Sequence, residues 1–145
     1  MALDLNYPRV KIYQDGLPLC GREEEIVRVI AGRGGLNHQL ILDLIEKGAV
    51  LVGTESGELI LEEYDQLRRL SRVRDPDERS EIYREAEGLR RQLLLKRDEF
   101  IAGRIDKTLQ EEETGILFIG LLHDVTKSLP ADIDVSFLAD LSASG

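Results

Sequence analysis

The stretch GILFIGLLHD, residues 115–124, is an apolar run that ends on a histidine and an aspartate. Short, continuous apolar runs are typical of strands that are buried inside a parallel sheet. We therefore predict a strand over residues 115–122, followed by a polar loop. Polar residues directly after a parallel strand lie where open α/β sheets bind their ligands, so the same stretch also raises a question of function.

Three more segments predict strands. They are VKIY at residues 10–13, AVLVG at residues 49–53 and IDVSFL at residues 133–138. Each is short and rich in β-branched or aromatic residues, and the turn pair Asp15-Gly16 closes the first.

Apolar residues at helical spacing predict four helices between these strands. The first runs from about Arg22 to the glycines at 32–35, and the second from about Asn37, as its N-cap, to Lys47. The third covers about residues 58–72. Strands that alternate with helices indicate an α/β fold with a mostly parallel sheet of about four strands, flanked by helices.

The fourth helix has the clearest start. Asp75 is a good N-cap, Pro76 suits the first helical position, and Asp77 and Glu78 favour the positive helix end. No proline follows before about Leu109, so we expect a long, charged helix. Three or four turns are usual, and we therefore expect the helical pair at 58–110 to project from the sheet and support a homo-oligomer, with a dimer as the expected form.

The bulk composition bounds the class of protein. The chain has 145 residues, 42% of them hydrophobic and 32% charged, which is typical of one globular domain over 1–145, with residues 139–145 as a loose tail. A net charge of −9 argues against nucleic-acid binding, and the arginines of the third and fourth helices alternate with acidic residues. We expect no nucleic-acid partner and no membrane association.

The chain contains one cysteine, Cys20, which excludes an internal disulfide. We expect this thiol to be buried and unreactive. The first ten residues, MALDLNYPRV, lack the basic and apolar pattern of a secretory signal, and we therefore expect a cytoplasmic location.

Candidate site residues lie at the ends of three of the predicted strands. They are Asp15 at the first, Gly53, Thr54 and Glu55 at the second, and Gly120, His123 and Asp124 at the third. Because the carboxyl ends of parallel strands meet at one edge of a sheet, we expect one rim that binds a ligand. Carboxylates and an imidazole suit a divalent metal or an acid–base pair.

Within this rim the residue types suggest separate roles. His123 and Glu55 are the candidate catalytic residues, and His123, Glu55 and Asp15 are the candidate ligands of a divalent metal; the cofactor is otherwise left open. Asp15, Gly53, Thr54, Gly120 and Asp124 are the candidate ligand-binding residues. The alternative is purely structural, with Asp15 in a turn, Glu55 and Ser56 capping the third helix, and Asp124 capping a short turn.

The segment RDEFIAGRIDKTL at residues 97–109, followed by GILFIGLLHD, resembles the closing segment of the TraB/PrgY–ChaN–TIKI superfamily. In that segment a helix with an arginine leads into a buried strand that ends G-x-x-H, here Gly120 and His123. VGTES at residues 52–56 is similar to the opening strand of the superfamily, with Ser56 where that motif has histidine. The resemblance implies a site at residues 53–55 and 120–123. It does not carry over metallopeptidase or haem-binding activity, because the ligand set is incomplete.

These patterns leave three hypotheses for function. We favour a module that binds a small ligand or a protein at the strand-end rim. The first alternative is a metal-dependent, hydrolase-like enzyme that uses His123 with Glu55, Asp15 or Asp124. The second is a structural homo-oligomer that uses its long helices.

Overall fold

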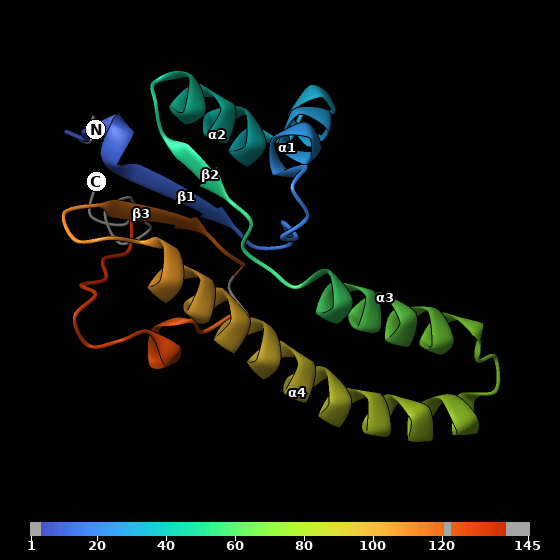
Figure 1. Ribbon diagram of the computed structural model, residues 1–145. Helices are drawn as coiled ribbons and strands as arrows, with labels where there is room; N and C mark the ends of the chain where they lie inside the picture. Colours follow the sequence, from blue (N-terminus) through green and yellow to red (C-terminus); the bar gives the residue numbers. More distant parts are fainter. Residues whose placement is uncertain (1–3, 121–122, 139–145) are drawn as a thin grey trace.

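The computed structural model describes residues 4–120 and 123–138. Its strands are β1 (Val10–Gln14), β2 (Val50–Val52) and β3 (Thr114–Phe118); its α-helices are α1 (Glu23–Gly32), α2 (Leu36–Glu46), α3 (Gly57–Arg72) and α4 (Pro76–Thr108), and its short 3₁₀ helices are η1 (Tyr7–Arg9) and η2 (Thr126–Ser128). The α/β class is confirmed (Figure 1).

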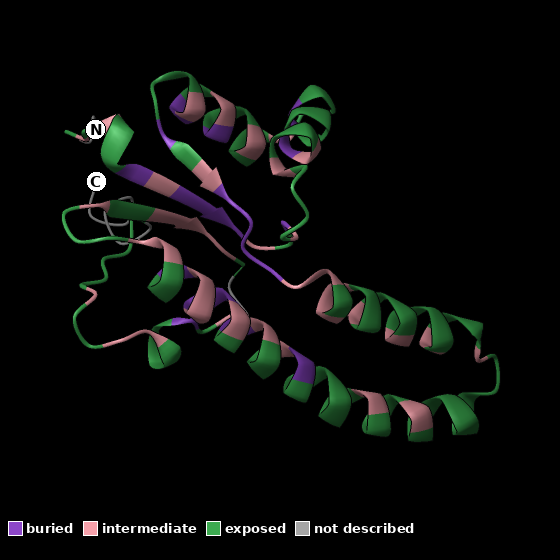
Figure 2. Ribbon diagram, in the orientation of Figure 1, coloured by how far each residue is buried: buried purple, intermediate pink, exposed green. Residues whose placement is uncertain are grey.

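The three strands form one parallel sheet in the order β2-β1-β3. Ile12 of β1 lies opposite Leu51 of β2 and Ile116 of β3, which places the first strand of the chain at the centre of the sheet. Both later strands are therefore edge strands, and Val50 is 49% exposed. The central strand is the most buried of the three, as Figure 2 shows.

Alternate side chains of β1 enter two separate cores. Val10 and Ile12 pack with Val27 of α1 and with Ile41 and Leu44 of α2. Tyr13 packs on the opposite face of the sheet, in a cluster with Ile101, Ala102 and Ile105 of α4. The period of two along a strand is what sends neighbouring residues to opposite faces. The result is three layers, with α1 and α2 on one face and α4 on the other.

The predicted fourth strand is wrong. Residues 133–138 form no strand, and the sheet has three strands instead of about four. Ile133 packs on the α4 side of the sheet, but Val135, Phe137 and Leu138 are 46%, 58% and 51% exposed. Because neither alternating face of this segment is buried, the segment gains little from strand pairing. The tail at 139–145 and the last two residues of the predicted third strand, 121–122, lie outside the described residues.

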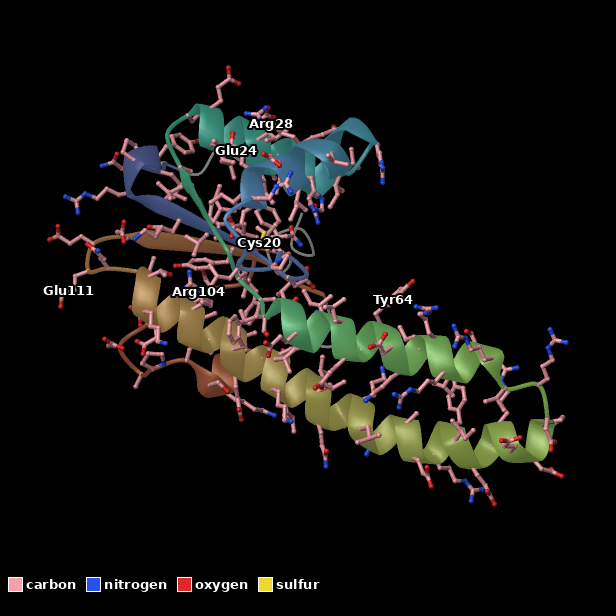
Figure 3. The ribbon with its side chains drawn as sticks, turned by 45° about the vertical axis from the view of Figure 1, so that its right-hand side comes forward. Cys20, Glu24, Arg28, Tyr64, Arg104 and Glu111 are labelled. Carbon is pink, nitrogen blue, oxygen red and sulfur yellow. The ribbon has the colours of Figure 1, made fainter. Side chains whose placement is uncertain are left out.

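The helix boundaries follow local chemistry closely. The Asp75 side chain accepts a hydrogen bond from the Asp77 N–H at 3.1 Å, and Pro76 opens α4 as expected. Ser56 caps α3 by accepting from the Leu59 N–H at 3.4 Å, which confirms its predicted capping role. The predicted N-cap Asn37 is wrong, because α2 begins at Leu36 and Gly35 is its N-cap, two residues earlier than predicted. The prediction that Cys20 is buried is also wrong, because this residue is exposed on the loop before α1 (Figure 3).

Helices α3 and α4 run side by side away from the sheet (Figure 1). Within α3 no residue is buried, and the buried residues of α4 begin only at Leu93. Among the described residues, the first half of α4 therefore packs mainly on α3. No helix within residues 4–120 and 123–138 combines the length and the apolar composition that crossing a membrane requires.

Candidate functional site

The order of the strands places a crevice beside the end of β1. The chain leaves β1 toward α1 and α2, whereas after β3 it passes to η2 and Val125 on the face covered by α4. Neighbouring parallel strands whose connections leave to opposite faces form the point at which open α/β sheets bind ligands. Asp15 follows β1 at this point, and Gly120 and His123 follow β3.

Asp15 is held in place through both carboxylate oxygens. Its Oδ2 accepts a hydrogen bond from the Gly120 N–H at 2.8 Å, and its Oδ1 accepts from Gln14 Nε2 at 2.7 Å. The turn continues through Gly16, which has a φ of 73° that favours glycine. Asp15 is thus a turn residue, as the structural alternative predicts, and its carboxylate also joins the ends of β1 and β3.

His123 forms a buried pair with an acid of α4. Its Nδ1 lies 2.5 Å from Asp98 Oδ1, and the two side chains are 7% and 6% exposed. The other oxygen of Asp98 accepts the Asp124 backbone N–H at 2.9 Å. A carboxylate beside Nδ1 fixes the orientation and tautomer of an imidazole and leaves Nε2 available. Nε2 of His123 lies 3.8 Å from Asp15 Oδ2, which places the imidazole between the two carboxylates.

Glu55 pairs with an arginine of α4 instead of capping α3. Arg97 Nε donates to Glu55 Oε1 at 2.5 Å and Arg97 Nη2 donates to Oε2 at 2.7 Å, a bidentate arrangement in which the Glu55 side chain is 1% exposed. The Gly16 N–H also donates to Glu55, and Arg97 Nη1 pairs with Glu63 of α3. These bonds, led by those with Glu55, raise the pKa of Arg97 well above its usual range.

A pocket of about 240 Å³ opens beside these groups. It is lined by Asp15, Glu63, Arg90, Leu94, Arg97, Gly120 and His123. Arg90, Leu94 and Arg97 are spaced i, i+4, i+7 on one face of α4. The size suits a small ligand better than a large cofactor, because pockets for drug-sized ligands usually exceed about 300 Å³.

The structure brings together three of the predicted site residues in this pocket: Asp15, Gly120 and His123. Glu55 lies behind Arg97. Thr54 is buried and bonds to the backbone of β1 and β2, and the Gly53 carbonyl accepts from Arg104 Nε at 2.9 Å. Figure 3 labels Arg104 on α4. Thr54 and Gly53 therefore hold the strand ends in place and do not line the pocket.

Asp124 is oriented away from the pair that its backbone supports. Its side chain accepts from Thr126 Oγ1 at 2.7 Å and pairs with Lys127 at 3.2 Å, and these two contacts lower its pKa. The side chain is 48% exposed. This arrangement agrees with the predicted cap of a short turn.

The predicted metal ligands do not form one cluster. Among residues 4–120 and 123–138, no group of three or more His, Cys, Asp or Glu side chains is placed to hold a metal ion. Both oxygens of Glu55 accept hydrogen bonds from Arg97, so the guanidinium takes the place that a metal ion would need on this carboxylate. The metal site stays a prediction that no contact among the described residues supports.

Sequence reasoning missed Asp98, Glu63, Arg90 and the role of Arg97. Asp98 carried a recognisable pattern, because it follows Leu94 by four residues and precedes Ile101 and Ile105 on the same helical face. An acid in an apolar stripe needs a buried partner. The arginines carried less information, because they resemble the solvated, charged surface of α3 and α4.

Comparison with protein-family models, with curated proteins and with solved structures found no match to this chain. The resemblance to the TraB/PrgY–ChaN–TIKI superfamily therefore stays an expectation. The assignment of function rests on the geometry of the pocket.

Proposed function

We propose that the chain binds a small polar ligand in the pocket beside β1 and β3 and hydrolyses an ester or amide bond of that ligand by acid–base chemistry. The observation that supports this proposal is the pair of contacts made by His123, which bonds to the buried Asp98 through Nδ1 and lies with Asp15 in the lining of the pocket. A buried acid–imidazole pair whose second nitrogen faces a pocket is a frequent arrangement for proton transfer.

The gap between Asp15 Oδ2 and His123 Nε2 is 3.8 Å, which is too long for a direct hydrogen bond. One water oxygen at about 2.8 Å from each atom can bridge them and donate a proton to both. That water keeps its lone pairs free for attack on a carbonyl carbon.

The chemical step then uses His123 as a base and afterwards as an acid. Nε2 takes a proton from the water while the water oxygen forms a bond to the carbonyl carbon. The tetrahedral intermediate collapses as the bond to the leaving oxygen or nitrogen breaks, and Nε2 returns the proton to that leaving group. Asp98 stabilises the imidazolium between the two steps, in the manner of other acid–histidine pairs.

The test is hydrolysis of p-nitrophenyl acetate and of a matching anilide by the wild type and by His123→Asn. Removing the base is expected to lower kcat/KM by about 10²- to 10⁴-fold. Asp98→Asn is expected to lower it as well and to remove the downfield proton NMR signal of the His123 Nδ1–H. Asp124→Asn is the matched control, because its exposed side chain lies on Thr126 and Lys127, and its rate is expected to stay at the wild-type value.

Equal rates for the wild type and His123→Asn would overturn the proposal. The pair would then serve only to hold the chain after β3 on α4, and the pocket would belong to a binding module without chemistry. We extend the proposal to the cytoplasm, because a single, exposed cysteine suits a reducing compartment.

A second candidate function is self-association through the helical pair. Leu61, Tyr64 and Leu67 of α3 are 63%, 57% and 54% exposed, and Leu89 of α4 is 50% exposed. Figure 3 shows Tyr64 on the side of α3 that faces away from α4. We propose a dimer that covers some of these side chains, and Leu89→Asp is then expected to lower the mass measured by light scattering. A monomeric wild type would exclude this candidate. Leu93 does not suit the test, because it is 4% exposed and its substitution would disturb the fold.

A further inference from the structure

The pocket has two arginines on one helix face, and they differ in how many of their donors are used. Arg97 carries five N–H donors in a planar fork. Two of these bonds go to Glu55 and one to Glu63, so Nη1 and Nη2 each retain a donor. Arg90 lines the same pocket two helical turns earlier and forms no ion pair with another described residue. Its neighbour Arg91, by contrast, pairs with Glu87 at 3.6 Å.

The two carboxylates that bind Arg97, those of Glu55 and Glu63, differ in burial and in the number of bonds that they make. The Glu55 side chain is 1% exposed and makes two bonds to the guanidinium, whereas the Glu63 side chain is 30% exposed and pairs with Nη1 alone. Of the two carboxylates, Glu63 is therefore the more hydrated and the less firmly bonded partner of Arg97. Glu63 also lies on α3, within which no residue is buried. Glu63 can therefore leave Arg97 at low cost, while Glu55 stays.

We propose that the ligand of this pocket carries an oxyanion, a carboxylate or a phosphate, that replaces Glu63 on Arg97 and is held on its other side by Arg90. The proposal rests on the proposed function, because it names the class of ligand bound in the same pocket. Arginine forks bind both oxyanions with good geometry, and Leu94 between the two arginines supplies an apolar contact for the carbon atoms next to the anion.

This arrangement also orients the ligand. The anionic group lies along α4 at Arg90 and Arg97, and the bond to be hydrolysed points to His123 and Asp15 at the strand ends. Asp15 repels a negative group at its own end of the pocket, so the reverse orientation is disfavoured. Glu63 occupies the place of the anion when no ligand is bound.

The experiment is a titration with inorganic phosphate and, separately, with acetate, followed by amide and guanidinium NMR shifts at constant ionic strength. Glu63→Gln removes the internal competitor for Arg97 and is expected to tighten binding at least about twofold. Arg90→Gln removes a charge-assisted bond and is expected to weaken binding about tenfold. A preference of phosphate over acetate, or the reverse, assigns the oxyanion.

Glu62→Gln and Arg91→Gln are the matched controls, because they change the same charges at neighbouring positions outside the pocket lining. Both are expected to bind the anions as the wild type does. The inference is wrong if Arg90→Gln behaves like Arg91→Gln, or if Glu63→Gln does not tighten binding. If the anions bind as expected but His123→Asn hydrolyses the ester and the anilide at the wild-type rate, only the proposed chemistry is overturned. If His123→Asn lowers hydrolysis but the anions do not bind as expected, the proposed chemistry stands and the substrate of the pocket is uncharged.

Discussion

Replacement of Arg97 by methionine is expected to destabilise the fold strongly. The change removes both bonds to Glu55, at 2.5 and 2.7 Å, and leaves a carboxylate that is 1% exposed with the Gly16 N–H as its partner. Breaking a buried ion pair from one side costs about 3–5 kcal/mol. Single domains are stable by about 5–15 kcal/mol, so this one change removes a large share of the total.

The cost should come from the stranded charge and not from lost packing, because methionine keeps most of the arginine stem. Adding Glu55→Gln to Arg97→Met removes that charge, and the double variant is therefore expected to be more stable than Arg97→Met alone. The free energy of unfolding is measured by urea denaturation, followed by circular dichroism at 25 °C. Arg91→Met is the control, since the Arg91 side chain is 79% exposed and its loss is expected to change stability by no more than about 0.5 kcal/mol.

A loss of less than about 1 kcal/mol in Arg97→Met, the range of an exposed pair, would contradict this prediction. A double variant that is less stable than Arg97→Met alone would contradict it as well. In either case the carboxylate and the guanidinium would have to be far better hydrated than their exposed fractions indicate.

Three further predictions concern stability. Burial raises the pKa of Tyr13, so the folded state keeps a proton that the unfolded chain releases near pH 10; stability is then complete below that pH and declines as the pH rises further, and urea denaturation of Tyr13→Phe is expected to show a smaller alkaline decline. Gly53→Ala places a methyl group 2.8 Å from the Leu19 Cα and is expected to cost about 1–3 kcal/mol by the same measurement; an unchanged midpoint would contradict the close approach. Asp75→Ala is expected to cost about 1 kcal/mol through loss of the α4 cap, whereas Asp77→Ala, which leaves the cap in place, should cost less.

The sequence allowed the prediction of those features that depend on neighbouring residues. Asp75 and Pro76 specify the start of α4 because a cap and a fixed φ act within one turn. The segment at 133–138 had a similar strand-like composition to β1, but a strand needs a partner, and partners depend on contacts distant in the sequence. Composition could not show that residues 133–138 would pair with neither edge strand of the sheet, β2 or β3.

The site was predicted in the same uneven way. Asp15 and His123 were found because their positions after strands follow from the topology of parallel sheets. Asp98 and Arg97 were missed because both lie on a helix that passes the carboxyl edge of the sheet. Which side chains of such a helix face the site depends on the rotation of the helix about its own axis. That rotation is set by the packing of Ile101 and Ile105 against Tyr13.

Helix α4 gives the site a mechanical property. It is one uninterrupted helix of 33 residues, about 50 Å long, whose sheet-bound half carries Asp98 and whose far half, among the described residues, packs on α3. From Pro76 to Arg97 the lever arm is about 30 Å, so a tilt of about 5° at the sheet moves the tip by almost 3 Å. A contact made at the far end of α3 and α4 can therefore change the distance between Glu63 and Arg97.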